Sequence, residues 1–581
     1  MDSTTRTAVR GFSKYGDVDI EVGKGATVVG AGTPVEYGLA GYYGDGISLY
    51  AYEGKATVHN SGAISTNGDG FAIHFVDMSG ENPAYKGTAS IENMGTITGA
   101  VLLGAGNDEF HNGGTFVATK DSDFGGGNDL FINTGTVSVR PGGAAAKAPG
   151  AVTFLGLERF ENQGGTVDLR NGIAGDTLTL PGTYVGSKNA TLGLDIAAGG
   201  KADMLVVGGI ASGTTNIVLN ATAANATLLS APVTLVKAGA GTKADAFTIL
   251  GQDIGFVSYG LAFDTPANAF TLTTRAGNAV RRLNQVTQGA QAIWQQQSDG
   301  WSTHMANLRD IENPGTRLWG QISGKVDTRH ARSEGANLGY RQGYYAIQAG
   351  ADLGGTRSDT GGLLFGLTGS YVSSHLNLRG GAERMRFNTL GLGGYAAFQT
   401  GPVFANLLGQ YNHYSINAQD KALQWNDGFN GNGYGATGEL GARLGGDRFF
   451  AEPVAALSWQ HSDIGALHAL GQTVSFAKGT ALDGKLGARI GGTAKLSPTA
   501  TANFYARGAY VHRFSGKGIA TLESGGTSDS VSGVKVGDYG QAALGLNIAT
   551  GAHVSGFIEA NADLGNTYKA AGGRAGISFK F

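Results

Sequence analysis

Residues 315–581 contain twelve segments in which apolar and polar residues alternate. Within residues 482–490, for example, Leu482, Leu486 and Ile490 alternate with charged residues. Successive side chains of a β-strand point to opposite faces, so each segment predicts a strand with one apolar and one polar face. The segments begin near residues 316, 341, 362, 386, 402, 433, 449, 479, 501, 537, 552 and 568. A soluble β-sandwich would show the same alternation, so the connections must decide between the two folds.

The connections differ in length in a regular way. Short turns, as at 399–402 and 446–448, alternate with longer links, of which 420–432 and 515–535 are the longest. Many segments also match the ~10-residue strands of outer-membrane barrels, which have short turns on one rim and long loops on the other. An even number of strands closes the sheet and leaves no edge in lipid. The sequence therefore predicts a twelve-stranded antiparallel transmembrane β-barrel with periplasmic turns and outer loops.

The last segment supports the barrel. Phe581, Phe579 and Ile577 share one face of the expected strand. A carboxyl-terminal Phe on an amphipathic strand is the usual assembly signal of bacterial outer-membrane proteins. We predict that these three residues form the barrel-assembly signal.

Residues 278–310 have a different pattern. Leu283 and Ile293 belong to an apolar set that recurs every three or four residues, which predicts a helix. Gly289 and Gly300 weaken this pattern, so one unbroken helix does not follow from it.

Residues 1–274 repeat a short phrase of Asn and Gly followed by β-branched residues. The copies begin at Asn60, Asn93, Asn112, Asn133 and Asn162. Asn and Gly tolerate positive φ and suit sharp corners, and Thr, Val and Ile suit the strand that follows. A phrase that returns about every 20–30 residues is typical of a solenoid with one coil per repeat. We predict a right-handed parallel β-helix, and the alternative is a Gly-rich β-sandwich.

Two fragments of the same region, 104–108 and 125–129, resemble calcium-binding β-roll repeats. Each lacks the first Gly and stands alone, so the favoured interpretation is a turn that caps a coil. Asp108 and Asp129 are weak calcium candidates, and the prediction is that the chain needs no metal and no cofactor.

No catalytic motif is found in residues 1–274. The Gly-x-Ser-x-Gly elbow and the His-Glu-x-x-His helix are both absent from this sequence. Asp69, His74 and Asp77 are close in sequence, and we interpret them as polar loop residues rather than as part of a triad. A paired-carboxylate site has no sequence motif and stays open. We expect no enzymatic activity.

Charge divides the chain at about the same place. Residues 1–274 hold 15 Lys and Arg against 25 Asp and Glu, and the remainder reverses the balance with 27 against 20. Neither part has a dense basic run, so nucleic acid is not an expected partner. The chain has no Cys, which excludes disulfides and thiol catalysis. The first residues lack the apolar core of a signal peptide, so we expect a longer natural precursor trimmed at residue 1.

The whole plan resembles a type Va autotransporter, the monomeric autotransporter family. Residues 315–581 look like its translocator barrel, 275–314 like the linker and helix that plug the barrel lumen, and 1–274 like its β-helical passenger. The resemblance implies insertion into the outer membrane with periplasmic chaperones and the barrel-assembly machinery. It also implies export of the passenger, which folds outside and is displayed on the cell surface or released.

The resemblance also implies site residues. Contacts between plug and lumen are expected from Arg281, Arg282 and Arg309 on the helix and from Glu439, Glu452, Asp483 and Glu559 on the barrel. Some relatives cleave their passenger at an Asn-Asn pair in this helix, but the helix here has none. Asn307 is a single, weak candidate for such processing, and the simpler interpretation is a polar plug residue.

Three functions remain open for the chain. The first is export and display of a binding or adhesion passenger with an unknown surface ligand, and the second is an enzymatic passenger such as a hydrolase or protease. The third is a plain pore, against which the plug argues. We predict the first, in a protein that acts as a monomer in outer-membrane lipid.

Overall fold

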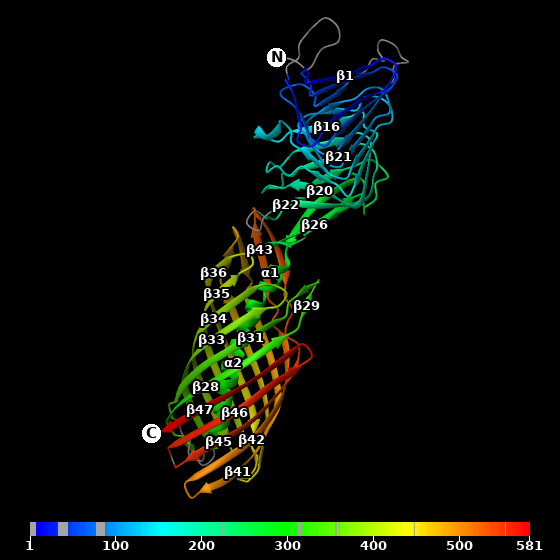
Figure 1. Ribbon diagram of the computed structural model, residues 1–581. Helices are drawn as coiled ribbons and strands as arrows, with labels where there is room; N and C mark the ends of the chain where they lie inside the picture. Colours follow the sequence, from blue (N-terminus) through cyan, green and yellow to red (C-terminus); the bar gives the residue numbers. More distant parts are fainter. Residues whose placement is uncertain are drawn as a thin grey trace. The chain divides into compact units, whose positions relative to one another are not determined.

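The computed structural model describes residues 7–32, 44–76, 87–221, 226–251, 253–311, 315–333, 335–354, 357–358, 361–446, 448–551 and 553–581 (Figure 1). The chain divides into two compact units, Met1–Arg275 and Ala276–Phe581. No helix of the described residues has both the length and the apolar character needed to cross a bilayer.

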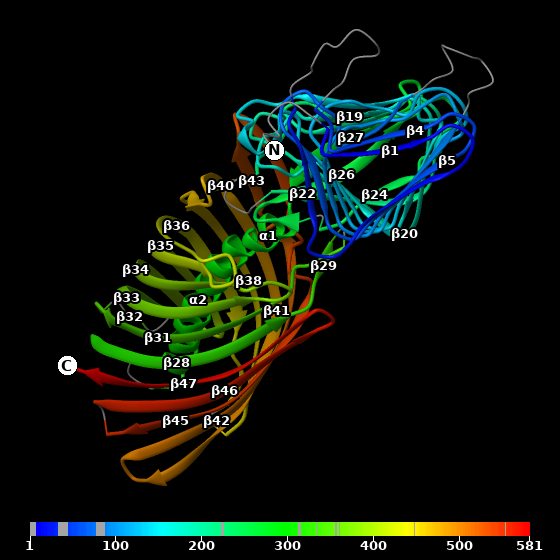
Figure 2. The same cartoon turned by 45° about the horizontal axis from the view of Figure 1, so that its top comes forward.

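The first unit is a stack of coils built from parallel strands, as Figure 2 shows. One face is β1 (Val9–Ser13), β4 (Ile47–Ala51), β7 (Ile73–Phe75), β10 (Val101–Leu102), β13 (Ser122–Asp123), β16 (Ala151–Leu155), β19 (Thr177–Leu180), β21 (Met204–Val207) and β23 (Val233–Lys237). The second is β2 (Val18–Val22), β5 (Lys55–Asn60), β8 (Thr88–Asn93), β11 (Glu109–Asn112), β14 (Leu130–Asn133), β17 (Arg159–Gln163) and the first part of β20 (Thr183–Asp195). The third is β3 (Thr27–Gly30), β6 (Ala63–Thr66), β9 (Thr96–Gly99), β12 (Thr115–Ala118), β15 (Thr136–Val139), β18 (Thr166–Asp168) and the rest of β20. The predicted β-helix-like solenoid is confirmed.

The last coils change the pairing. β22 (Ala211–Asn220) stacks on β20, and β24 (Phe247–Ile249) stacks on β22. β27 (Ala269–Ala276) then pairs antiparallel with β23, and β25 (Asp253–Ile254) and β26 (Val257–Asp264) complete this sheet. A short 3-10 turn, Gly143–Ala145, lies in the link before β16. An antiparallel end of this kind covers the last parallel edge of the solenoid.

The repeated Asn residues form a ladder inside the solenoid. Each Nδ2 group donates to the Oδ1 atom of the Asn in the next coil, at 2.7 Å from Asn60 to Asn93, 2.8 Å to Asn112, 2.8 Å to Asn133 and 3.0 Å to Asn162. The side chain of Asn162 continues the ladder to the hydroxyl of Tyr184 at 3.3 Å. All five Asn residues are buried. Buried amides must be hydrogen-bonded, so the ladder fixes the register of neighbouring coils.

The glycines of the repeat have a different role from the one predicted. Gly95, Gly114 and Gly135 are absent from the described residues with positive φ. A Cβ atom at Gly114 would lie 2.2 Å from the carbonyl oxygen of Gly95, and one at Gly135 would lie 2.1 Å from that of Gly114. The explanation by positive φ is therefore wrong here. Glycine is needed because backbones of successive coils approach too closely for a side chain.

The second unit begins with a helix in two parts, α1 (Asn278–Leu283) and α2 (Gln285–Leu308). The interruption is at Asn284, whose Nδ2 donates to Gly518 O at 3.0 Å, and the helix continues through Gly289 and Gly300. A Cβ at Gly300 would lie 2.5 Å from Gln348 Oε1, and one at Gly289 3.0 Å from Phe387 Cζ. The two glycines therefore allow close contact between helix and barrel wall instead of breaking the helix.

Twelve long strands form a closed antiparallel barrel around this helix (Figure 1). They are β28 (Arg317–Arg329), β31 (Tyr340–Asp352), β33 (Gly361–Leu378), β34 (Glu383–Thr400), β35 (Val403–Asp420), β36 (Trp425–Ala442), β38 (Phe450–Ile464), β41 (Gly479–Ser497), β42 (Ala500–Ser515), β45 (Tyr539–Thr550), β46 (Val554–Gly565) and β47 (Tyr568–Lys580). β28 pairs with β47, which closes the sheet. Four described strands of this unit have only two residues each: β29 (Arg332–Ser333), β30 (Ala336–Asn337), β32 (Arg357–Ser358) and β37 (Leu444–Gly445). The predicted twelve-stranded barrel is confirmed.

Two predicted long loops are ordered strands. Most of 420–432 belongs to β36, which begins at Trp425 and pairs with Asp420 of β35, so only a tight turn joins them. Within 515–535, β43 (Ile519–Ser524) and β44 (Thr527–Ser532) form a hairpin. This hairpin joins β39 (Leu467–Ala469) and β40 (Gln472–Phe476) in a four-stranded sheet. We call this end of the barrel the long-loop rim, and the end with the turns at 401–402 and 498–499 the short-turn rim.

Candidate functional site

The candidate site is the contact between α2 and the barrel lumen. Nearly every residue of α2 is buried, although many are Gln, Ser or Thr. Polar side chains of the wall receive them: Trp294 Nε1 donates to Ser458 Oγ at 3.3 Å, and Ser298 Oγ lies 2.9 Å from Thr437 Oγ1. The polar face of each strand thus points inward, as alternation in a membrane barrel requires. Hydrogen bonds of this kind join the helix to the wall, and an apolar cluster also packs between them near the end of α2: Trp301, Met305, Leu308, Trp319, Tyr395 and Leu408.

Gln297 shows how closely the helix and wall fit. Its Oε1 atom accepts from Gln410 Nε2 and from Asn412 Nδ2, both at 2.7 Å. Its Nε2 atom donates to Ser370 Oγ at 2.8 Å. One glutamine therefore connects two neighbouring regions of the wall, and buried amides with this many partners fix a single orientation of the helix.

A cluster of five charged side chains joins the end of the helix to the wall near the short-turn rim. We call it the ion cluster, and it comprises Arg309, Asp310, Arg443, Glu452 and Arg489. Glu452 contacts Arg309 at 3.2 Å, Arg443 at 3.0 Å and Arg489 at 3.4 Å. Asp310 contacts Arg443 at 2.8 Å and also pairs with Arg489. Both carboxylates are completely buried, so each depends on these cations.

Aromatic rings surround the cations of the ion cluster. The guanidinium carbon of Arg309 lies 3.7 Å from the ring centre of Phe404, and that of Arg443 lies 3.9 Å from Phe450. Arg489 lies 4.2 Å from the ring of Tyr505. Three cations face two carboxylates, and the rings add an attraction for the excess positive charge.

Further ion pairs occur along the helix. Asp299 contacts Lys485 at 2.8 Å, halfway along α2. Arg282 of α1 donates through Nε to Glu383 Oε1 at 3.0 Å near the long-loop rim. Both carboxylates are buried. The helix is therefore held by opposite charges at three levels of the lumen.

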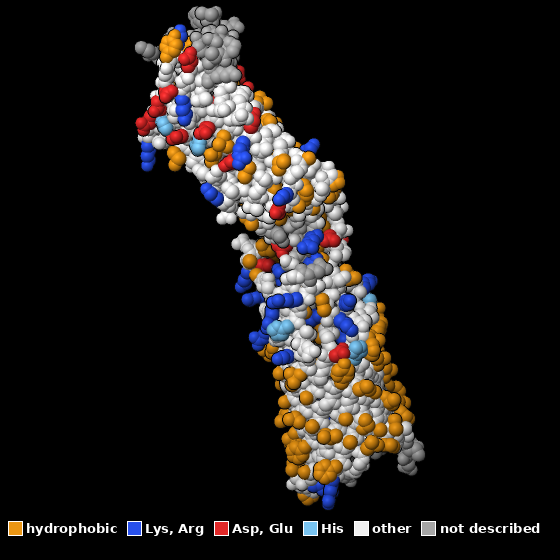
Figure 3. All heavy atoms as spheres, turned by 90° about the vertical axis from the view of Figure 1, so that its right-hand side faces the viewer, with side chains coloured by type: hydrophobic (Ala, Val, Ile, Leu, Met, Phe, Trp, Pro, Cys, Tyr) orange, Lys and Arg blue, Asp and Glu red, His pale blue; other side chains and the backbone are white. Residues whose placement is uncertain are grey.

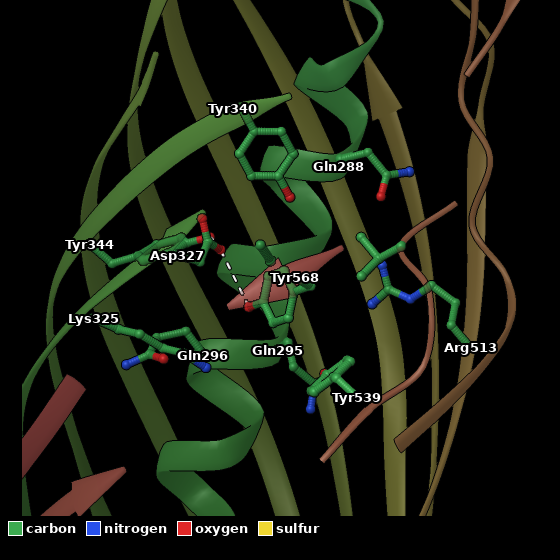
Figure 4. Close-up of a pocket in the computed structure, with 12 residues that line it drawn as sticks. Gln288, Gln295, Gln296, Lys325, Asp327, Tyr340, Tyr344, Arg513, Tyr539 and Tyr568 are labelled. Carbon is green, nitrogen blue, oxygen red and sulfur yellow. Dashed lines mark hydrogen bonds between the residues drawn. The ribbon is translucent and has the colours of Figure 1, made fainter. Parts of the chain in front are cut away.

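A small cavity separates the helix from the wall at one point (Figure 4). Its volume is about 20 Å³, which is room for one water molecule. Asp327 lies at its edge and accepts from the hydroxyls of Tyr344 at 2.6 Å and Tyr568 at 3.4 Å. Gln288, Gln295 and Gln296 of the helix line the same cavity, so the helix reaches the wall on its other sides at this level.

The structure places the predicted lumen residues in different environments. Arg309 lies against Glu452, while Glu439 accepts from Ser302 of the helix. Asp483 and Glu559 differ from the expectation, because arginines of the barrel pair with them. Asp483 contacts Arg513 at 2.7 Å, and Glu559 contacts Arg507 at 3.1 Å and Arg574 at 3.3 Å. Arg281 lies on α1 next to Arg282, whose partner is Glu383.

Sequence reasoning missed Glu383, Asp299 and Asp310 on the acidic side and Arg443, Arg489, Arg507 and Arg513 on the basic side. The barrel residues lie at positions whose alternation places them inside the lumen. An excess of charged residues on that face was visible in the sequence. Which of these residues form an ion pair also depends on the height of each one along the barrel axis, and alternation does not give that height.

Asn307 lies near the end of α2 and is buried. Its backbone oxygen accepts from Asn547 Nδ2 at 3.2 Å, and both polar atoms of its side chain lack hydrogen-bond partners. Cleavage of the backbone at Asn307 would need an acid or base beside it, and among the described residues no carboxylate is hydrogen-bonded to Asn307. The predicted assembly residues Ile577, Phe579 and Phe581 are 47%, 44% and 76% exposed on the outer face or end of β47.

The calcium candidates cap backbone groups instead of converging on a common point. Asp108 Oδ1 accepts from Ala89 N at 2.6 Å, and Asp129 Oδ1 accepts from Asp108 N at 2.8 Å. Glu158 continues the series by accepting from Asp129 N at 2.8 Å. In the described ranges, no three His, Asp or Glu side chains are arranged to hold a metal ion. Burial raises the pKa of Asp129 to about 6.

His74 belongs to another capping network. His74 Nδ1 lies 2.9 Å from Asp45 Oδ2, and Ser48 Oγ donates to the same oxygen at 3.0 Å. The Ser48 hydroxyl therefore donates to the Asp45 carboxylate and not to the His74 imidazole. A nucleophilic serine would instead be hydrogen-bonded to the histidine that acts as its general base. The carboxylate beside His74 is thus Asp45 and not Asp69, whose backbone N donates to Gly32 O at 3.0 Å. Asp77, the third residue of the sequence interpretation, lies outside the described residues.

Comparison with known proteins finds similarity in the barrel. Residues 318–561 match the family model of the autotransporter β-domain. Similar solved structures include the β-domain of the Bordetella autotransporter BrkA, at 18% identity over 46% of this chain and 100% of that chain, with a TM-score of 0.38. The transport unit of AIDA-I from Escherichia coli is 17% identical over 45% and 90%, with a TM-score of 0.40. The translocator domain of NalP from Neisseria meningitidis is 14% identical over 51% and 99%, with a TM-score of 0.39. No curated protein matches the chain.

Proposed function

We propose that the barrel, whose residues 318–561 match the autotransporter β-domain, exports residues 1–274 as its passenger and that this passenger serves as a binding module on the cell surface. We further propose that one chain is the functional unit, that the assembly machinery of the outer membrane inserts it, and that the passenger is not an enzyme. The surface of the passenger supports the first of these proposals, its role in binding.

An exposed aromatic cluster on the first coils carries the binding proposal. The side chains of Phe12 and Tyr15 are 63% and 75% exposed. The ring of Phe12 lies 6.3 Å from that of Tyr50 and 5.6 Å from that of Tyr52. Arg10 lies over Tyr50, with 5.2 Å between the guanidinium carbon and the ring centre. Exposed aromatic residues next to an arginine are typical of binding surfaces.

The polar face of the second sheet supports an extended partner. His59 of β5 contacts Glu92 of β8 at 2.9 Å, and His111 of β11 contacts Glu109 at 3.3 Å. All four side chains are about half exposed, between 42% and 55%. Identical strand spacing of about 4.8 Å places such groups in regular rows along the solenoid. A long, regular surface favours a polymer or another cell surface over a small substrate.

The test uses intact cells that produce the full chain with a cleavable export signal. Proteinase K should remove the passenger and leave the barrel, as followed with antibodies to both halves. Cell aggregation and retention on mucin should require the passenger and fall strongly in the double variant Phe12→Ser, Tyr15→Ser. The matched control is Met94→Ser with Leu250→Ser, because these residues are also exposed, at 71% and 54%, outside the cluster.

Three results would count against these proposals. A passenger that resists protease until the cells are lysed would show that it is not displayed. A displayed double variant that aggregates and adheres as well as the unsubstituted chain would show that the aromatic cluster is not the binding surface. Hydrolysis of an ester or peptide by purified chain, lost with the passenger, would favour the enzymatic alternative.

A further inference from the structure

The outside of the barrel carries a group of unpaired cations near the long-loop rim. Figure 3 shows Lys and Arg side chains gathered above a band of hydrophobic side chains on one side of the barrel. We call the group on β31, β34 and β47 the basic patch, and it comprises Arg341, Arg384, Arg386 and Lys569. All four side chains are exposed.

Strand pairing places these residues close together. Lys569 is opposite Thr328, Thr328 is opposite Arg341, and Arg341 is opposite Asn377, which is opposite Arg384. Because neighbouring strands lie about 4.8 Å apart, Arg341 is separated by two strands, or about 10 Å, from Lys569 on one side and from Arg384 on the other. Arg386 is two residues further along β34 and is opposite His375, which is also exposed.

None of these cations has an acidic partner in the part of the chain that the structure describes. No ion pair or hydrogen bond of the described residues involves the side chains of Arg341, Arg384, Arg386 or Lys569. The acidic residues of the same strand ends, Asp327 and Glu383, face the lumen. The outward positions nearby are Asn377, Asn388 and His375. The patch therefore presents net positive charge to whatever surrounds the barrel.

The height of the patch relative to the lipid follows from the aromatic residues below it. Tyr371, Tyr411, Tyr434 and Trp459 are 42%, 47%, 49% and 40% exposed on the outer face. Aromatic rings of this kind mark the boundary between hydrocarbon and headgroups. Leu390 of β34 is opposite Tyr371, and Arg386 lies four residues from Leu390 in the direction of the long-loop rim. Four residues of a strand tilted by about 40° correspond to roughly 10 Å, which is the headgroup region.

We propose that the basic patch binds the phosphate groups of a phosphorylated glycolipid in the outer leaflet. Guanidinium groups pair with phosphate through two parallel hydrogen bonds, and the absence of competing carboxylates leaves them available. Separate cations on nearby strands can each pair with one phosphate of a headgroup that carries two phosphates on a disaccharide. The amides of Asn377 and Asn388 provide donors for the sugar between them.

The experiment measures glycolipid binding to the refolded full chain in a neutral detergent by native mass spectrometry. The probes are diphosphorylated lipid A and the same lipid after removal of both phosphates. The variant Arg384→Gln, Arg386→Gln should bind the phosphorylated lipid about tenfold more weakly, because two charge-assisted contacts are lost. The dephosphorylated lipid should bind weakly to both proteins.

A matched control removes two exposed cations at the other end of the barrel, in Arg448→Gln, Lys495→Gln. Binding should be unchanged in this control. Equal losses in the variant and the control, or equal binding of the dephosphorylated lipid, would overturn the proposal. Displacement of the lipid by an equal concentration of inorganic phosphate would also overturn it, because the patch would then be a site for free anions. Unchanged heat-modifiable migration on gels shows that each variant is folded.

Discussion

The two units bury different kinds of side chain inside their β-sheets. The solenoid buries apolar rings, such as Phe131 and Phe160 with centres 4.9 Å apart, and one ladder of neutral amides. The barrel exposes its apolar residues, with Leu392 72% and Leu544 68% accessible, and buries arginines and carboxylates. The difference follows from the surroundings, because water favours a polar outside and lipid an apolar one. The stabilising contacts differ as well. In the solenoid they join neighbouring coils, and in the barrel they join the helix to the wall across the lumen.

The largest expected effect comes from the ion cluster. Glu452→Ala leaves Arg309, Arg443 and Arg489 with one carboxylate fewer in a buried site. Removing one partner of a buried ion pair destabilises a protein by about 3–5 kcal/mol. We expect a loss of this size in the free energy of unfolding, measured by tryptophan fluorescence of the full chain in detergent with increasing guanidinium.

The control for the ion cluster is an exposed pair on the same barrel. Asp463 contacts Lys478 at 3.0 Å, with side chains 50% and 68% exposed. Asp463→Ala should change the free energy of unfolding by less than about 0.5 kcal/mol. Equal effects of the two substitutions would mean that burial does not decide the strength of these pairs.

The Asn ladder should give the next largest effect. Asn112→Ala removes the donor to Asn133 Oδ1 and Thr136 O, and also the acceptor for Asn93. Leaving buried polar groups without partners costs about 2–3 kcal/mol here. Hydrogen exchange of the full chain, followed by mass spectrometry, should show faster exchange in the coils on both sides of Asn112 and no change in the barrel.

An exposed Asn in the neighbouring turn provides the comparison. Asn107 Oδ1 accepts one exposed hydrogen bond from Asn128 N at 2.9 Å. Asn107→Ala should alter exchange only in that turn, by less than about 1 kcal/mol. Similar exchange in the two variants would indicate that the ladder does not couple the coils.

Close stacking of the coils gives a third test. In Gly114→Ala, the added Cβ lies 2.2 Å from the carbonyl oxygen of Gly95, so the two coils must separate. Overpacking of this kind costs about 1–3 kcal/mol. Gly126→Ala is the control, because no atom lies within 4 Å of its Cβ. Urea midpoints for protease resistance of the passenger in the full chain should fall for the first variant alone.

These tests rest on features that the sequence revealed only in part. Alternation located all twelve barrel strands, because one face of each strand must match lipid. It placed the start of β36 at 433 instead of Trp425, since the strand extends to the long-loop rim, where Asn and Gly residues replace the alternation. The Asn repeat revealed the solenoid, but the reason for its glycines emerged only from the stacking of coils. Ion partners such as Glu383 required the strand register, which no short pattern contains.

The smallest expected effect is a pH dependence confined to the solenoid. Burial raises the pKa of Asp129 to about 6, above the value of about 3.9 expected in the unfolded chain. The folded state therefore binds the proton more strongly, and this contribution to stability is complete below about pH 4 and is lost as the pH rises through 6.

Asp129→Asn keeps an acceptor for Asp108 N without the charge. This variant should be about 1 kcal/mol more stable than the unsubstituted passenger at pH 7 and equally stable at pH 4. Urea midpoints for protease resistance at the two pH values measure the difference, and a gain of the same size at both would show that the buried charge is not its cause.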